Sequence, residues 1–129
     1  MLQDGIAFEA HLQNTVVRFS LAPPYELRGF VICDFGRLHV DPPTLLALTG
    51  VMLDVVLGHS IIAETLDDVY TRMYHTMFCN HLQQLVHMLG LHYNGKGWDV
   101  IHLPLWEAIP CGHALKKAWL GKEAKTIAY

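Results

Sequence analysis

Histidine and cysteine pairs offer the most evident chemistry in this histidine-rich sequence. The chain holds nine histidines and three cysteines. His75 and Cys79 are spaced to share one face of a predicted helix, while Cys111 and His113 stand at the predicted start of another. Zinc sites need about four such ligands in tetrahedral geometry, so these residues would bind zinc if the two helices met. Because the pairs lack the tight spacing of zinc motifs, we expect no metal or other cofactor, with zinc as the alternative.

Cys111 is also the best candidate for a catalytic thiol. It stands at a predicted helix N-terminus, where the helix dipole favours a thiolate, and catalysis would further need a histidine base within hydrogen-bond reach. His113 is poorly placed as that base because it lies on the same turn, so the more distant His92 or His102 would supply it. Cys33 is predicted to be buried in a central strand and therefore inert.

A face rich in methionine and tyrosine on the longest predicted helix is expected to be a contact surface. Methionine and aromatic side chains at helical spacing are more often core or interface groups than a cofactor site. We therefore assign a subunit interface to Tyr70, Met73, Met77 and His81. Asp54 lies on the only polar strip of the preceding helix, and we expect it to be exposed to solvent.

Composition and charge exclude several classes of protein. Hydrophobic residues make up 52% of the chain, which excludes intrinsic disorder, and charged residues only 16%. The net charge of −3 provides no basic patch for nucleic acid. Residues 44–63 are long and apolar enough to resemble a membrane span, but a central Asp54 favours a buried globular helix, so we predict no transmembrane segment. The sequence also lacks the common nucleotide-binding, zinc-protease, hydrolase and EF-hand motifs.

Hydrophobic periodicity predicts three strands in the first third of the chain. Residues 6–12 and 17–21 alternate between apolar and polar side chains, which is typical of half-buried strands. Residues 27–35 are apolar on both faces and therefore indicate a central strand that is covered on both sides. Together these segments predict an antiparallel three-stranded meander.

Two long helices are expected next. The first is predicted over 42–57, with Asp41 as its N-cap and Gly58 as its stop. Its apolar residues surround nearly the whole circumference, so we expect it to be deeply buried. The second is predicted over 66–89 and begins with a capping pair at Thr65.

The last third is predicted to form a further strand or hairpin and a C-terminal helix. The Asn94-Gly95 turn precedes an alternating segment over 98–103, and the helix is expected over 111–120. The element order predicts the α+β class, and a length of 129 residues suits a single domain over 1–129 with a frayed tail at 122–129.

These features predict a non-enzymatic, self-associating protein-interaction or regulatory module. Low charge and extensive apolar helix faces favour a homo-oligomer, most simply a dimer, that also binds an unidentified protein partner. The alternatives are a small Cys/His-dependent enzyme or zinc-binding protein, and a binder of a small ligand. An odd number of cysteines and no recognisable signal peptide indicate an intracellular, cytoplasmic protein.

Overall fold

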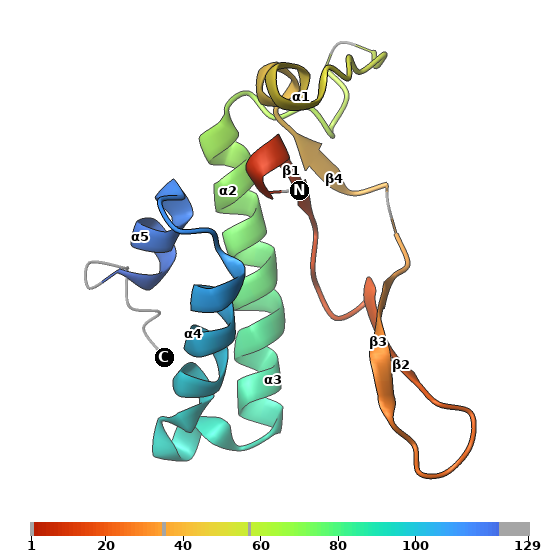
Figure 1. Cartoon of the computed structure of the whole chain (residues 1–129), viewed down its shortest axis with the longest axis vertical. Helices are drawn as coiled ribbons and strands as arrows, with labels where there is room; N and C mark the ends of the chain where they lie inside the picture. Colours follow the sequence, from red (N-terminus) through yellow and green to blue (C-terminus); the bar gives the residue numbers. More distant parts are fainter. Residues whose placement is uncertain (1, 35, 57, 122–129) are drawn as a thin grey trace. The chain divides into compact units, whose positions relative to one another are not determined.

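The computed structural model describes residues 2–34, 36–56 and 58–121 of the chain. These residues fall into two compact units, Met1–Gln83 and Gln84–Tyr129. The first unit contains two small antiparallel sheets and several helical segments. The second unit is helical (Figure 1). This architecture confirms the predicted α+β class. The single domain over 1–129 stays a prediction, and the tail at 122–129 lies outside the described residues.

The first sheet joins the N-terminal strand to a strand far along the chain. After a short 3-10 turn at Leu2–Asp4, β1 (Ile6–Phe8) pairs antiparallel with β4 (Leu38–Val40), and Ala7 lies opposite His39. Ala7, His39 and Val40 are all buried. Val40 also forms a parallel bridge with Ile62, which lies shortly before the helix that begins at Leu66.

The second sheet is a hairpin of β2 (Thr15–Phe19) and β3 (Leu27–Ile32). The loop between its strands contains a cis peptide bond at Pro23-Pro24. No residue of either strand is buried. The predicted three-stranded meander is therefore wrong, because β1 pairs with β4 and not with β2. β3 is apolar on both faces without being a central strand, since alternation reveals which side chains are apolar and not what covers them.

The first helix is shorter and more exposed than predicted. α1 (Pro42–Thr49) begins at Asp41, whose side chain accepts a hydrogen bond of 3.0 Å from the Thr44 N–H. It ends at Gly50, which adopts the left-handed conformation at φ 73° and donates its N–H to Leu46 O. Leu48 is 61% exposed, so the expected deeply buried helix over 42–57 is wrong. The sequence offered two glycines as stops, and the earlier one ends the helix.

The second predicted helix is confirmed in position, although its middle is not α-helical. α2 (Leu66–Tyr74) begins with a capping box between Thr65 and Asp68, as the sequence predicted. The chain then passes through a π-helical segment, His75–Leu82, and α3 (Gln83–Met88). The core of the first unit lies where α2 contacts β1; it consists of Ala7, Ala63 and Val69, with Met73 packed against it.

The second unit contains a helix where a strand was predicted. A 3-10 turn at Leu91–Asn94 leads into α4 (Lys96–Ala108). The Asn94-Gly95 turn forms, but the following segment continues as a helix. Its aromatic rings recur every four positions and contact one another along one helix face, as Trp98, His102 and Trp106 do. Gly97 is required in α4, since a Cβ atom there would overlap the Val86 side chain.

The predicted C-terminal helix is confirmed as α5 (Ala114–Leu120), with His113 as its N-cap. Its buried side chains are Leu115, Trp119 and Leu120. Among the described residues, no helix is long and apolar enough to cross a membrane.

Candidate functional site

Three nitrogen-bearing side chains gather around one carboxylate in the first unit. Glu9 Oε1 lies 3.3 Å from His39 Nε2. Glu9 Oε2 lies 3.5 Å from Arg37 Nη1 and 3.7 Å from His11 Nε2. We refer to Glu9, His11, Arg37 and His39 as the Glu9 cluster.

The β1–β4 sheet positions this cluster. Glu9 directly follows β1, and its backbone N–H donates to Arg37 O over 3.3 Å, which extends the pairing one step past the strands. Asn14 is buried and donates its side-chain N–H to Glu9 O over 3.4 Å. The backbone of Glu9 is therefore held through both its N–H and its C=O group.

His39 forms the buried side of the cluster. Its side chain is only 8% exposed, and its Nδ1 is buried without a hydrogen-bond partner. Placing the proton on Nε2 lets His39 donate to Glu9 and leaves no buried N–H unpaired. His39 therefore holds the Glu9 carboxylate in place from the buried side of the cluster.

His11 and Arg37 form the accessible side. The Arg37 side chain is 65% exposed, and its contact with Glu9 uses only one of its five N–H donors. A guanidinium presents its donors in a planar arrangement that suits a carboxylate or another oxyanion. Arg37 is therefore the side chain of the cluster that is most accessible to an anionic group.

All four residues predicted as an interface belong to the first unit, and their side chains are partly buried in it. Met73 packs against the buried core, and His81 Nδ1 lies 2.9 Å from Ala10 O, so both side chains already have intramolecular contacts. Tyr70 and Met77 are half-buried. Their use as a subunit interface stays a prediction.

Burial affects two tyrosines of the same helix. It raises the pKa of Tyr70 above 10.0, and the nearby Asp41 carboxylate adds to this effect. Burial likewise raises the pKa of Tyr74, with a smaller contribution from Cys79. Both phenols therefore stay neutral to a higher pH than a fully exposed tyrosine does.

The predicted zinc ligands are not gathered within either unit. His75 and Cys79 lie in the π-helical segment of the first unit, whereas Cys111 and His113 belong to the second. Across the described residues, no group of three or more His, Cys, Asp or Glu side chains is arranged to hold a metal ion.

Cys111 is exposed and has a cationic neighbour. Lys116 Nζ lies 3.8 Å from Cys111 Sγ, donates to Ile109 O over 3.2 Å and sits 4.4 Å from the centre of the Trp106 ring. Lys116 therefore serves mainly to fix α5 to the end of α4. Cys33, predicted to be buried, is exposed because β3 has no covering layer.

The histidines proposed as bases for Cys111 have other roles. His113 Nδ1 accepts the Leu115 N–H over 3.2 Å and so caps α5. His92 stacks on His87 at 4.2 Å between ring centres, and its Nδ1 is buried. His102 stacks on Trp106. Each ring is thus held in a packing or capping contact.

Sequence reasoning missed Glu9 and Arg37. Glu9 and His11 fall on the polar face of the first predicted strand, but Arg37 lies 28 residues further along the chain. The only signal was that a half-buried strand carried a carboxylate next to a histidine. Its partners depend on the pairing of β1 with β4, which the sequence pattern did not indicate.

A family model described as "Ferric iron reductase FhuF-like transporter" matches residues 1–95, which include the whole Glu9 cluster. The chain belongs to the FhuF-like family. This match covers the first unit and extends into the second.

Three relatives are enzymes or enzyme-like proteins that are named for siderophore synthesis. The FhuF-like chain is 40% identical over 114 residues to an NRPS-independent siderophore synthetase of Rhizopus delemar. The aligned segment covers 88% of this chain and 18% of the relative. The chain is 34% identical over 109 residues to an NRPS-independent siderophore synthetase-like protein of Aspergillus thermomutatus, covering 84% and 17%. It is 34% identical over 84 residues to staphyloferrin A synthase of Staphylococcus aureus, covering 64% and 13%.

The FhuF-like chain thus spans less than a fifth of the length of these relatives. No solved structure matches it.

These matches overturn the functional interpretation of the sequence. The predicted non-enzymatic interaction or regulatory module is wrong, because the family and its relatives belong to iron and siderophore metabolism. The names of these relatives state no catalytic group or metal, so the alternative of a Cys/His-dependent enzyme or zinc-binding protein stays a prediction. Low charge and apolar helix faces indicate how much apolar surface has to be buried. They do not distinguish a free-standing module from a portion of an enzyme.

Proposed function

We propose that the FhuF-like chain acts in siderophore synthesis as the counterpart of the aligned portion of an NRPS-independent siderophore synthetase. The observation that carries this proposal is the 40% identity to the Rhizopus delemar synthetase over 88% of the chain. The two further relatives with siderophore names support the same assignment.

The Glu9 cluster is the proposed contact point with the substrate. Siderophores bind ferric iron through anionic oxygen groups, so their building blocks carry groups that an arginine can bind. Arg37 and His11 would hold such an oxyanion, while Glu9 and the buried His39 keep both donors in position. The cluster would therefore orient a substrate, and the chemical step would use groups contributed by the rest of the enzyme.

A chimeric enzyme tests this function. The aligned segment of the Rhizopus delemar synthetase is replaced by this chain, and siderophore formation is measured by mass spectrometry. We expect the chimera to make the siderophore, and Arg37→Ala to lower kcat/KM by at least about tenfold through the loss of one charge-assisted interaction. Arg72→Ala, which removes another exposed arginine of the same unit, is the matched control.

Two results would contradict the proposal. A folded chimera that makes no siderophore would exclude the function. Equal losses in the Arg37→Ala and Arg72→Ala chimeras would exclude the Glu9 cluster as the substrate contact and leave a general effect of charge.

We also propose a cytoplasmic location and self-association as a twofold dimer. All three cysteines are free thiols, which is typical of proteins in reducing compartments. The apolar side chains exposed on the isolated chain support association. Light scattering of the purified chain tests the dimer, and a mass of 14.6 kDa that does not grow with concentration would exclude it.

A further inference from the structure

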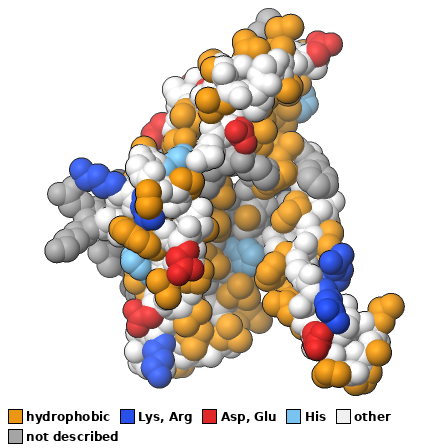
Figure 2. Space-filling model, in the orientation of Figure 1, with side chains coloured by type: hydrophobic (Ala, Val, Ile, Leu, Met, Phe, Trp, Pro, Cys, Tyr) orange, Lys and Arg blue, Asp and Glu red, His pale blue; other side chains and the backbone are white. Residues whose placement is uncertain are grey.

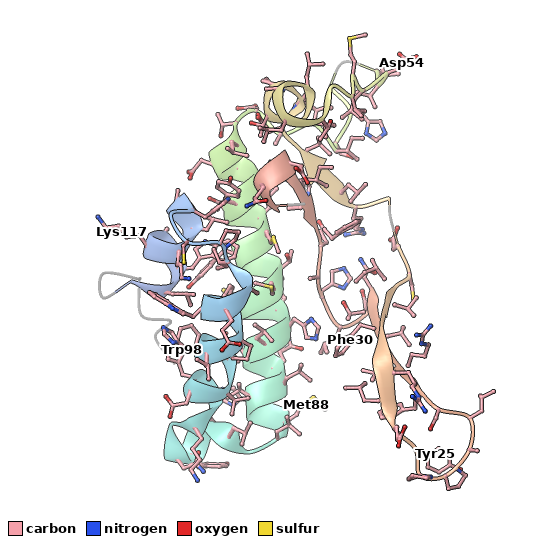
Figure 3. All side chains as sticks on the ribbon, in the orientation of Figure 1. Tyr25, Phe30, Asp54, Met88, Trp98 and Lys117 are labelled. Atoms are coloured by element: carbon pink, nitrogen blue, oxygen red, sulfur yellow. The ribbon has the colours of Figure 1, made fainter. Side chains whose placement is uncertain are left out.

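The β2–β3 hairpin exposes an unusual amount of apolar surface. Phe30 is 66% exposed and Tyr25, in the connecting loop, 69% (Figure 3). The other exposed apolar side chains of this segment are Val16, Val17, Phe19, Leu21, Leu27 and Val31. Hydrophobic side chains therefore cover much of the hairpin surface seen in Figure 2.

The strand register divides these side chains between two faces. Val17 lies opposite Phe30 and Phe19 opposite Leu27, so these four side chains share one face. Val16 lies opposite Val31 on the other face. Neither face is covered by a helix of the first unit, and the outer edge of each strand has no partner strand among the described residues.

The few charges on the hairpin do not change this apolar character. Glu26 and Arg28 form an ion pair of 2.8 Å with each other, so these charges neutralise one another. Arg18 donates to Arg28 O across the strands. An isolated two-stranded hairpin is at best marginally stable in water, and contiguous exposed apolar patches usually mark an interaction site.

The relatives indicate what covers the hairpin. The siderophore synthetases are more than five times as long as the segment that aligns with this chain, and the hairpin lies inside the family match over 1–95. In these enzymes a large remainder of the same polypeptide is thus held next to the aligned segment. A covalently linked surface is present at high effective concentration, so a modest apolar contact is sufficient for stable docking.

We propose that the β2–β3 hairpin is the docking surface for the remainder of a siderophore synthetase, an apolar surface of that enzyme outside the segment aligned with this chain. This inference rests on the proposed function. The face formed by Val17, Phe19, Leu27 and Phe30 supplies the apolar contact, and the free strand edges allow an additional strand to pair. Docking of this kind brings the Glu9 cluster of the same unit to the synthetase.

Hydrogen exchange tests the proposal on three proteins: this chain alone, the chimera, and the natural Rhizopus delemar synthetase. We expect the amides of 15–32 to exchange rapidly in the isolated chain and at least about tenfold more slowly in the chimera and at the aligned positions of the natural enzyme. The natural enzyme makes the test independent of whether the chimera folds.

Substitutions identify the surface that is responsible. Phe30→Lys should restore rapid exchange of 15–32 in the chimera and leave the isolated chain unchanged. Leu48→Lys, at another exposed apolar residue of the same unit, should leave protection of the hairpin intact.

Three other outcomes overturn the docking proposal, and a fourth overturns only the proposed function. Rapid exchange of the hairpin in a natural enzyme that makes siderophore excludes docking while leaving the proposed function in place. Protection in the dilute isolated chain means that this chain covers its own hairpin. Protection of the isolated chain that rises with concentration means that a second copy covers it. A chimera whose hairpin is protected but which makes no siderophore excludes the proposed function alone.

Discussion

Two small antiparallel sheets in the same unit differ in what covers them. In the β1–β4 sheet, Ala7, His39 and Val40 are buried, and α2 contacts both strands. In the β2–β3 hairpin no residue is buried, although most of its strand residues are apolar and two of them are phenylalanines. The difference is the covering layer and not the strand sequence, because an apolar side chain is buried only where another element reaches it.

The two sheets also distribute polar residues in an unexpected way. The covered sheet carries His39, which lies beside the half-buried Glu9, while the uncovered hairpin carries Phe19 and Phe30. A free-standing domain normally has the opposite arrangement, with polar groups outside and aromatic groups inside. This inversion agrees with the proposal that the hairpin docks on the remainder of a siderophore synthetase.

The largest expected difference in unfolding free energy is between substitutions of a buried and of an exposed phenylalanine. Phe78 is buried and stacks on Tyr74 at 4.7 Å between ring centres. Phe78→Ala should lower the free energy of unfolding of the isolated chain by about 3–5 kcal/mol. Phe30→Ala in the hairpin should change it by less than about 0.5 kcal/mol. Urea unfolding measures both, and similar losses would mean that the hairpin is packed in solution.

A second pair of variants compares carboxylates near the two sheets. Glu9→Ala removes the acceptor for the buried His39 N–H and should cost about 1–3 kcal/mol of unfolding free energy. Glu26→Ala breaks an exposed ion pair on the hairpin and should cost less than about 1 kcal/mol. If Glu26→Ala proves the more harmful in urea titrations, the assignment of the buried cluster is wrong.

A third prediction concerns stability at alkaline pH. Because burial raises the pKa of Tyr70 above 10.0, the unfolded chain loses this proton before the folded chain does. The stabilising contribution is therefore complete below pH 10 and is lost as the pH rises further. Tyr70→Phe should make the urea midpoint less sensitive to pH between about 9 and 11.

Tyr25→Phe is the control for this prediction, since Tyr25 is exposed in the hairpin loop. It should leave the alkaline loss of stability unchanged. Equal behaviour of the two variants would show that the environment of Tyr70 does not contribute to the pH dependence.

The smallest expected effect concerns thiol labelling. Cys33 follows the exposed hairpin, whereas Cys79 is half-buried in the π-helical segment. At pH 7 a soluble thiol reagent should modify Cys33 and the exposed Cys111 before Cys79, as followed by mass spectrometry of digested peptides. Labelling of Cys79 first would indicate that the π-helical segment opens more readily than the hairpin end.

The sequence alone determined the features that depend on neighbouring residues. Asp41 and Thr65 cap helices where the sequence predicted, because an N-cap side chain bonds to backbone groups within the next three residues. The α+β class and the C-terminal helix follow from local periodicity in the same way. The end of α1 was misplaced since Gly50 and Gly58 offer the same local signal.

Only the tertiary structure decided which distant segments meet. The pairing of β1 with β4 brings Arg37 and His39 to Glu9, and without that pairing the sequence shows only scattered histidines and charges. The strand predicted over 98–103 became part of α4 because its apolar residues suit both periods and packing against Val86 selects the helix. The pattern of apolar residues indicates which faces of an element favour burial. Which segment buries them is decided by contacts between parts of the chain that are far apart in sequence.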